Sequence, residues 1–490
     1  MLTQFQVQNF KAFEDTTPIA LKPLTLLSGI NSAGKSSVIQ ALLLLKQTLE
    51  SPPSLALSPG KGRLLEQSLG DNFNDFIFGC PDLDNAQLRY TLSFAFDRER
   101  DFDVYAEARA FYGGDGLRRV ETDLDLTFQW GAFGHRGRPT VRVSDLNISL
   151  RLDNIQLVSL RIYPAETGGK YVVESKPEQC TELFQGAALS ALEVDGLSNF
   201  LPDTLMISAQ NAPSPIPSPI SFIRLFRAIF VAMRRALSDD FCYLNSFRNP
   251  PQRIYGTGQT AGRVLEPNGS NFAEVLWQLQ DEEVSFINSD ATESRLPLPQ
   301  MVDYVLREVL GLAQPLRVAS IAQDILQVQL ETLGSAPIPV TLSDVGLGYN
   351  QILPVVLQGL LTPPGGLVIF EQPEIHLHPD VQAKLVTFFV GLAKTGRRVL
   401  METHSSHMIE HLCLEIAQDR TNWLAENVQT LFVHAPDAEH AGARIEAIRI
   451  TPYGEILNWP PHFLPDIAAL DEKIIRAGFA KQQAERESQG

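Results

Sequence analysis

Gly29-Ile-Asn-Ser-Ala-Gly34-Lys35-Ser36 is the stretch that decides the fold of this 490-residue chain. It has the spacing of a phosphate-binding loop, which is a Gly, four residues, and then Gly, Lys and Ser. Residues 3–29 before it have the apolar pattern of strands, and Lys35–Leu49 has the apolar spacing of a helix. A strand, a glycine loop and a helix in this order are the context that the motif requires.

This loop offers several groups that bind phosphate. Its glycines let the backbone N–H groups and the helix N-terminus face phosphate oxygens. Lys35 is placed to reach the β- and γ-phosphates, and the Ser36 hydroxyl is placed to ligate Mg²⁺. We therefore predict that ATP and Mg²⁺ bind here. The predicted contacts are Asn31, Ser32, Ala33, Gly34, Lys35, Ser36 and Ser37.

A second motif, Gly366-Leu-Val-Ile-Phe-Glu371, has the pattern of a buried strand that ends in a carboxylate. We expect this strand to lie beside the strand of the phosphate-binding loop and to bring Glu371 to the Mg²⁺. It follows the loop by more than three hundred residues. Small GTPases and most kinases have no such gap.

Two further motifs lie close to this strand in the sequence. Ser343 and Gly346 precede an apolar helix, and such a helix N-terminus is an arrangement that binds anions. The simpler alternative is an ordinary glycine-containing helix cap. The apolar residues Val399-Leu-Met lead into Glu402-Thr-His404-Ser, where His404 is placed to donate to a γ-phosphate or to an attacking water.

Together, GINSAGKSS, SDVGLGYNQ, FEQPEIHLHP and METHS resemble the ABC-type ATPases related to the SMC, RecF and OLD families. The segments Tyr243–Arg253 and Ile450–Phe463 extend the resemblance, whereas the middle of the chain matches in architecture only. The resemblance implies a homodimer or higher oligomer through a shared ATP site, in which Ser343 and Gly346 close the site of the other subunit. It also implies that His376 and His378 serve packing and dimer contact, in preference to metal binding.

One pair of residues departs from that family. ABC-type ATPases usually end this strand with Asp-Glu, where the Glu polarises the attacking water, and this chain has Glu371-Gln372. A neutral amide cannot act as a general base, although Gln372 can orient a water. Glu374 and Glu402 are the acids that we consider as replacements. Glu402 lies two residues from His404, so alternation directs both side chains to one side. Our hypothesis is that hydrolysis is slow, with catalytic candidates Gln372, Glu374, Glu402 and His404.

Composition and charge limit the possible functions. The net charge of −17 argues against a surface coated with Lys and Arg for binding nucleic acid. The four cysteines are scattered without a CxxC pair, which predicts reduced thiols in a cytoplasmic protein. We expect no signal peptide and no membrane contact. The cysteines are Cys80, Cys180, Cys242 and Cys413.

The predicted fold class is α/β, with a P-loop NTPase head of the ABC type. An antiparallel β lobe, a helical insertion and a small C-terminal α/β appendage complete the prediction. We assign a strand to each apolar segment of the β lobe, including 102–112. The predicted boundaries are 1–85 and 315–435 for the head, 86–175 for the β lobe, 176–313 for the helical insertion and 436–490 for the appendage.

The resemblance also implies a function. Several relatives are ATPase subunits of bacterial anti-phage systems, such as Septu-like and PARIS-like assemblies, in which a separate nuclease does the damage. After His404 the chain lacks the acids of the nuclease domain that OLD proteins carry. We therefore expect a sensor or scaffold that controls a partner nuclease and responds to DNA or a phage-derived trigger.

The main alternative is a RecF-like, ATP-gated DNA clamp for repair or maintenance. It requires a basic stripe, and the simpler interpretation of the same arginines is that they form ion pairs within the chain. An ABC transporter subunit and a regulatory ATPase unrelated to nucleic acid are further alternatives. The arginines are Arg234, Arg235, Arg248, Arg253 and Arg263.

Overall fold

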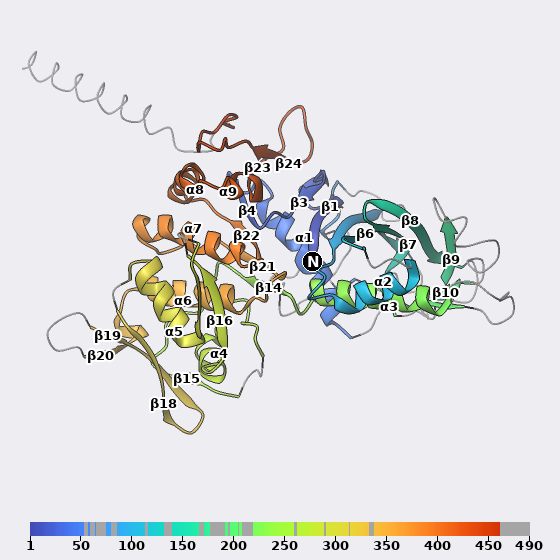
Figure 1. Cartoon of the computed structure of the whole chain (residues 1–490). Coiled ribbons are helices and arrows are strands. Elements are labelled where there is room, and N and C mark those ends of the chain that lie inside the picture. The colour runs from blue at the N-terminus through green and yellow to red at the C-terminus, as the bar shows by residue number, and fades with distance from the viewer. Residues whose placement is uncertain are drawn as a thin grey trace, which may run out of the picture.

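Two large sheets organise the protein in the computed structural model, and Figure 1 shows them side by side. One is a mostly parallel six-stranded sheet and the other a ten-stranded antiparallel sheet, counted over the residues that the structure describes. These residues are 1–52, 57–58, 64, 75–79, 86–112, 116–131, 140–165, 171–176, 192–194, 197–203, 205–207, 219–258, 262–288, 291–312, 314–332 and 338–460.

The six-stranded sheet carries the sequence motifs. Its strand order is β14-β21-β22-β4-β23-β24, and all neighbouring strands are parallel except β23 and β24. The bounds of these strands are Phe241–Leu244, Leu367–Glu371, Arg398–Glu402, Leu24–Gly29, Val428–His434 and Arg444–Ile448. Its helices are α1 (Lys35–Glu50), α6 (Leu347–Leu361), α7 (Pro379–Lys394), α8 (Ser406–Gln418) and the short α9 (Trp423–Asn427).

Our prediction that the strand of Glu371 lies beside the strand of the phosphate-binding loop is wrong. β22 lies between β21 and β4 and pairs with both. The chain leaves β21, crosses over through α7 and returns into the position next to β4, because parallel neighbours need such a crossover. Glu402, at the end of β22, therefore lies in the strand next to that of the loop, and its carboxylate accepts from Ser36.

The ten-stranded sheet contains the expected meander. β5 to β9 pair consecutively and antiparallel, and the sheet continues through β1 to β2 at one end and through β10 to β13 at the other. The bounds are β1 (Leu2–Phe10), β2 (Phe13–Asp15), β3 (Ile19–Ala20), β5 (Gln87–Ala95), β6 (Val120–Gly131), β7 (Thr140–Leu152), β8 (Ile155–Pro164), β9 (Tyr171–Lys176), β10 (Leu192–Val194) and β13 (Leu205–Ile207).

Residues 102–112 are a helix, so our prediction of a strand there is wrong. In α2 (Phe102–Tyr112) the buried side chains are Val104, Tyr105, Ala108 and Phe111. This spacing places them on one face of a helix, and α2 packs with that face toward α3 (Pro219–Leu237). The apolar residues of this segment resemble an alternating strand in the sequence, but burial against α3 stabilises the helix.

The predicted insertion 176–313 is not uniformly helical. α3, α4 (Phe272–Gln278), α5 (Leu298–Tyr304) and the π-helical turn Val305–Val309 are helical as expected. However, β10 and β13 extend the antiparallel sheet, and β14 is an edge strand of the nucleotide sheet. The remaining short strands of this region are β11 (Leu197–Ser198), β12 (Leu201–Pro202), β15 (Tyr255–Gly256), β16 (Glu283–Ile287) and β17 (Glu293–Pro297).

Two other predicted boundaries also differ from the structure. β1 to β3, which we assigned to the head, belong to the antiparallel sheet, and β24, which we assigned to the appendage, pairs with β23 of the head. Backbone pairing across these boundaries is the physical reason. Residues 461–490 lie outside the described residues. A small third sheet contains β15, β18 (Leu316–Ala322), β19 (Ile325–Glu331) and β20 (Pro339–Thr341).

Two of the four cysteines can be placed. Cys242 is a buried free thiol and Cys413 a partly buried one, whereas Cys80 and Cys180 lie outside the described residues. Among the described helices, none combines the length and the apolar character needed to cross a membrane.

Candidate nucleotide site

The phosphate-binding loop joins β4 to α1, as the sequence predicts. Gly29 has φ 149° and Gly34 has φ 111°, conformations that side chains rarely adopt. A Cβ atom on Gly29 would lie 2.5 Å from the carbonyl oxygen of Val433, and one on Gly34 would lie 2.9 Å from the Cβ of Ala12. The two glycines therefore let the loop pass between β23 and the turn that joins β1 to β2.

Lys35 and Ser36 lie at the start of α1. The Lys35 ammonium is buried and donates to the carbonyl oxygens of Gly29 (3.0 Å) and Ile30 (2.8 Å). Burial lowers the pKa of Lys35, and the nearby Glu402 carboxylate opposes that shift. The Ser36 side chain is exposed, and its hydroxyl donates to Glu402 Oε2 at 3.2 Å. The loop thus holds the ammonium against its own backbone, next to an accessible hydroxyl.

The remaining predicted loop contacts surround this pair. Asn31 and Ser32 are exposed, and Ser32 has φ 61°, a left-handed conformation. Ser37 is partly exposed and its backbone N–H donates to the carbonyl of Gly34 (3.0 Å). Ala33 is fully buried, so only its backbone is available to a ligand.

Glu371 and Glu402 end two neighbouring parallel strands at the same level. Their Cα atoms are register partners in the pairing of β21 with β22. Burial raises the pKa of Glu371 to about 7, and the charge of Glu402 adds to this effect. Burial also raises the pKa of Glu402, against the opposing effects of Lys35 and the Ser36 hydroxyl. The Glu402 carboxylate beside the Ser36 hydroxyl, with the Glu371 carboxylate at the end of the neighbouring strand, supplies oxygen ligands of the kind that Mg²⁺ takes.

Glu374 is committed to the turn that follows β22. It is 7% exposed, and its Oε1 accepts from the Thr403 hydroxyl (2.8 Å) and from the His404 backbone N–H (2.9 Å). Burial raises the pKa of Glu374, and these hydrogen bonds lower it. Glu374 therefore orients the segment that presents His404, which leaves it poorly placed to take a proton from water.

His404 lies near Glu402, the carboxylate that alternation along the extended segment places on the same side. Its Nε2 lies 4.0 Å from Glu402 Oε1, and the imidazole is partly exposed. Burial lowers the pKa of His404, and the positive charge of Lys35 lowers it further. The ring is therefore neutral at pH 7, and it can donate one N–H to an oxygen beside the loop.

Gln372 follows Glu371 with a left-handed backbone, at φ 44°. Its N–H donates to the carbonyl of Glu402 (2.8 Å), and its own carbonyl accepts from the Arg248 guanidinium (3.4 Å). The sequence did not predict this contact of Arg248. The only signal for it was the resemblance of the segment Tyr243–Arg253 to the related ATPases, which gave no position in the fold.

Ser343 and Gly346 lie where a helix begins. Ser343 is in a 3₁₀ turn (Leu342–Asp344), and Gly346 caps α6 with an extended backbone and open space around its Cα. The Ser343 hydroxyl is buried and has no hydrogen-bond partner among the residues described. Among the described residues, no hydrogen bond joins Ser343 or Gly346 to the phosphate-binding loop of the same chain.

A family model agrees with this geometry. Residues 1–96 and 312–409 match the model of an AAA ATPase domain, and these segments hold every site residue described above except Arg248. Over these segments the chain is similar to an AAA ATPase domain. The two matched segments make up less than half of the chain, and the sequence between them is the insertion that splits the ATPase domain.

No curated protein matches the chain. Solved structures that resemble it include an SMC head bound to the C-winged helix domain of ScpA, at 10% identity and TM-score 0.40, covering 91% of this chain and 97% of that one. The SMC head domain from Thermotoga maritima has 10% identity and TM-score 0.38, covering 92% and 99%. An SMC head with an extended coiled coil, bound to the C-terminal domain of ScpA and derived from Pyrococcus furiosus, has the same identity and TM-score, covering 91% and 96%.

His378 has a structural role beside the ATPase site. It caps α7, and its Nδ1 accepts from the backbone N–H of Asp380 at 3.3 Å. His376 is exposed with φ 62°, and its carbonyl lies 3.6 Å from where a Cβ of Gly348 would be. These contacts fit the packing role that we predicted for this turn.

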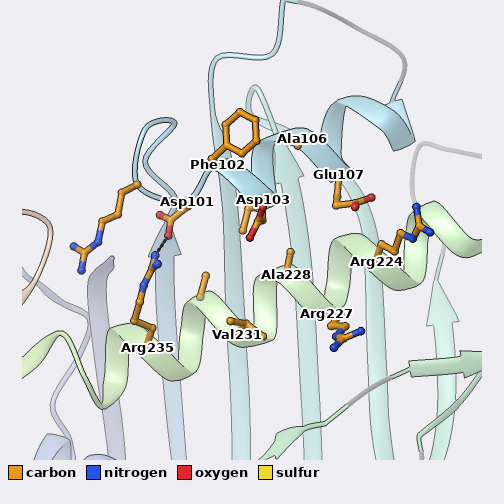
Figure 2. A pocket seen from close by; sticks show the side chains of 13 residues that line it. Asp101, Phe102, Asp103, Ala106, Glu107, Arg224, Arg227, Ala228, Val231 and Arg235 are labelled. Atoms are coloured by element: carbon orange, nitrogen blue, oxygen red, sulfur yellow. Dashed lines mark hydrogen bonds and ion pairs between the residues drawn. The ribbon is translucent and has the colours of Figure 1, made fainter.

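The five arginines of the alternative DNA clamp are engaged within the chain. Arg235 pairs with Asp101, which Figure 2 shows, and Arg263 pairs with Glu282. The other contacts are Arg234 with Asp203 (3.2 Å), Arg253 with Asp344 (3.0 Å) and Arg248 with the carbonyl of Glu371 (3.1 Å). They form no continuous unpaired stripe, so the ion-pair interpretation is the better one.

A groove of about 440 Å³ lies outside the ATPase site. Figure 2 shows it between α2 and α3, with Asp103 and Glu107 on one wall and Arg224 and Arg227 on the other. Its lining includes no residue of the phosphate-binding loop or of the strand ends at Glu371 and Glu402. This groove is therefore separate from the nucleotide site.

Proposed function

We propose that this chain is a dimeric, ATP-binding and slowly hydrolysing ATPase that acts as a sensor or scaffold and controls a partner nuclease in bacterial anti-phage defence. The observation that carries the slow rate is the arrangement of acids around Gln372. The neutral amide of Gln372 stands where the water-activating acid of ABC-type ATPases is expected. Each carboxylate nearby already has another role.

Those roles follow from the contacts of each acid. Glu402 accepts from Ser36 at 3.2 Å, so it belongs with the metal ligands together with Glu371. Glu374 is held by Thr403 and by the His404 N–H. A general base typically accelerates a reaction by about 10²–10⁴-fold. We therefore expect a site without a free general base to hydrolyse ATP more slowly by about that factor.

The metal-binding residues fit Mg²⁺ by their chemistry. Ser36, Glu371 and Glu402 supply a hydroxyl and two carboxylates, which are the oxygen ligands that Mg²⁺ prefers. When bound, Mg²⁺ supplies positive charge that neutralises the phosphate oxygens. Lys35 leaves the carbonyls of Gly29 and Ile30 to bind the phosphates, and the His404 N–H holds an oxygen beside them.

The unpartnered Ser343 hydroxyl supports the shared site. A buried hydroxyl without a hydrogen bond costs free energy, and each such group in a native structure calls for an explanation. It lies one turn before the exposed N-terminus of α6, where an anion is favoured. We propose that the γ-phosphate bound by a second copy accepts from Ser343 and contacts the Gly346 N–H.

Single-turnover hydrolysis and ATP-dependent dimerisation test this proposal together. At saturating Mg²⁺, we expect ATP to shift the chain from monomer to dimer, and the dimer to outlast many turnovers of an ordinary transporter ATPase. Ser343→Arg is expected to abolish the dimer without abolishing ATP binding. A hydrolysis rate comparable to a transporter ATPase, or a chain that stays monomeric with ATP, would rule the proposal out.

The role in defence rests on the motif resemblance and has its own test. The tagged chain is purified from its native host with and without ATP, and the preparation is assayed for nuclease activity. We expect a nuclease subunit to be present. A preparation that retains DNA only with ATP, and contains no nuclease, would favour the RecF-like clamp. The paired arginines argue against that clamp.

A further inference from the structure

Arg248 occupies the junction of three segments of the ATPase. It follows β14, is 8% exposed, and its guanidinium lies against the end of β21. Its Nη2 donates to the carbonyls of Glu371 (3.1 Å) and Gln372 (3.4 Å). Its Nη1 lies 3.4 Å from Gln351 Oε1, on the second turn of α6. One buried cation thus contacts both the metal-binding strand and the helix that begins at Gly346.

The hydrogen bonds of this arginine are incomplete. Arg248 Nε is buried and has no hydrogen-bond partner among the described residues, and the same is true of Glu374 Oε2. Both side chains are more than nine-tenths buried, and a charged Glu374 carboxylate favours the charged guanidinium of Arg248. Burial lowers the pKa of Arg248 to about 10, so the guanidinium remains charged at pH 7. A buried donor and a buried acceptor without partners each carry a desolvation cost, which pairing with one another would remove.

The N-terminal half of α6 is fastened to the same junction. Asn350 Nδ2 donates to the carbonyl of Asn249 (2.6 Å), next to Arg248 in the chain. Gly348 packs against the turn that follows Gln372, where a Cβ would lie 3.6 Å from the His376 carbonyl. A shift of α6 therefore moves Arg248 through two side chains, and its guanidinium carries that shift to the carbonyls of Glu371 and Gln372.

We propose that Arg248 is a positioning residue that couples α6 to the end of β21. This inference rests on the proposed function, because the phosphate of a second copy is what engages Ser343 and Gly346 and shifts α6. In the shifted state Arg248 Nε donates to Glu374 Oε2, and the Glu371–Gln372 segment is fixed for hydrolysis. ATP bound to one subunit thereby sets the geometry of the site in the other.

A double-mutant cycle tests the coupling. Arg248→Lys keeps the charge but loses the forked geometry, and Gln351→Leu removes the acceptor on α6 with little change of volume. We expect each variant to bind MgATP within about twofold of the wild type and to hydrolyse it at least about tenfold more slowly in single turnover. The double variant is expected to be no slower than the slower single variant, because both break one connection.

Arg397 provides a matched control. It is also a buried arginine, 3% exposed, and it donates to the carbonyls of Leu360 and Thr362 at the opposite end of α6. Arg397→Lys is expected to lower thermal stability while hydrolysis per bound ATP stays at the wild-type level. Thermal unfolding of all variants shows which of them fold. If Arg248→Lys does not fold, Gln351→Leu alone still tests the coupling.

The outcomes separate this inference from the proposed function. If the wild type binds ATP and dimerises, but Gln351→Leu hydrolyses at the wild-type rate or the two variants add independently, the coupling is wrong. Equal losses in ATP affinity and rate would also overturn it, since they indicate general damage. A wild type that neither binds ATP nor dimerises would refute the proposed function.

Discussion

Replacing Gln372 by Glu is expected to accelerate ATP hydrolysis about 10²-fold. The change is isosteric, and the backbone stays in place because the Gln372 N–H is held by the carbonyl of Glu402. A general base contributes about 10²–10⁴-fold, or roughly 3–5 kcal/mol of barrier. We expect the lower end, because the new carboxylate joins Glu371 and Glu402, whose pKa values are already raised. Like charges about 7 Å apart near a surface repel by roughly 2 kcal/mol.

The assay is single-turnover hydrolysis of labelled ATP at saturating Mg²⁺, with affinity and dimerisation measured on the same samples. The rate of Gln372→Glu is expected to fall as the pH is lowered, because the new base must be deprotonated to act. Gln372→Asn is the control, since it changes the side chain without adding an acid and is expected to give no acceleration. If Gln372→Glu binds ATP, dimerises and is no faster than the wild type, then Gln372 is not what limits the rate.

The remaining predictions concern the loop and the acids. Lys35→Ala removes the ammonium that the loop holds and is expected to weaken MgATP binding at least about tenfold, measured with a fluorescent nucleotide. An unchanged affinity would contradict the assigned site. Gly29→Ala places a Cβ 2.5 Å from the Val433 carbonyl oxygen, at a φ of 149°. We expect it to lower the unfolding free energy, measured in denaturant, by about 2 kcal/mol or more. Gly346→Ala, at an exposed glycine with open space around its Cα, is the control and is expected to have a small effect. The raised pKa of Glu371, about 7, means that the folded chain binds more protons than the unfolded chain between about pH 4.5 and 7, so stability falls as the pH rises through that window. Without Mg²⁺ we expect the unfolding free energy to fall by roughly 1–3 kcal/mol across this window, and we expect Glu371→Gln to lack this fall. Identical pH profiles of stability for the wild type and the variant would contradict this assignment.

The parts of the site that the sequence predicted correctly are local. A glycine loop between a strand and a helix needs only the residues from Gly29 to Ser36, and the apolar strands ending at Glu371 and Glu402 are defined by their own composition. The start of α6 after Gly346 is likewise a short-range signal. Each of these elements has its signal in a short stretch of sequence, although β4 pairs with β22, more than three hundred residues away.

The parts that the sequence could not provide depend on distant residues. The position of β22 between β21 and β4 is set by a crossover and not by any motif, and it brings Glu402 to Ser36. Residues 102–112 form a helix because α3, more than a hundred residues later, buries one face of it. Arg248 gave no sign of its burial, since its partners come from three separate segments.

α3 leads directly into β14, so a short link joins this helix to the six-stranded nucleotide sheet. Only residues 238–240 separate the end of α3 from the edge strand of the nucleotide sheet. Within that link Asp240 is clamped by Arg100, which also donates to the Pro364 carbonyl just before β21. The short link and the contacts of Arg100 therefore fix the position of α3 relative to the edge strand that leads to Arg248.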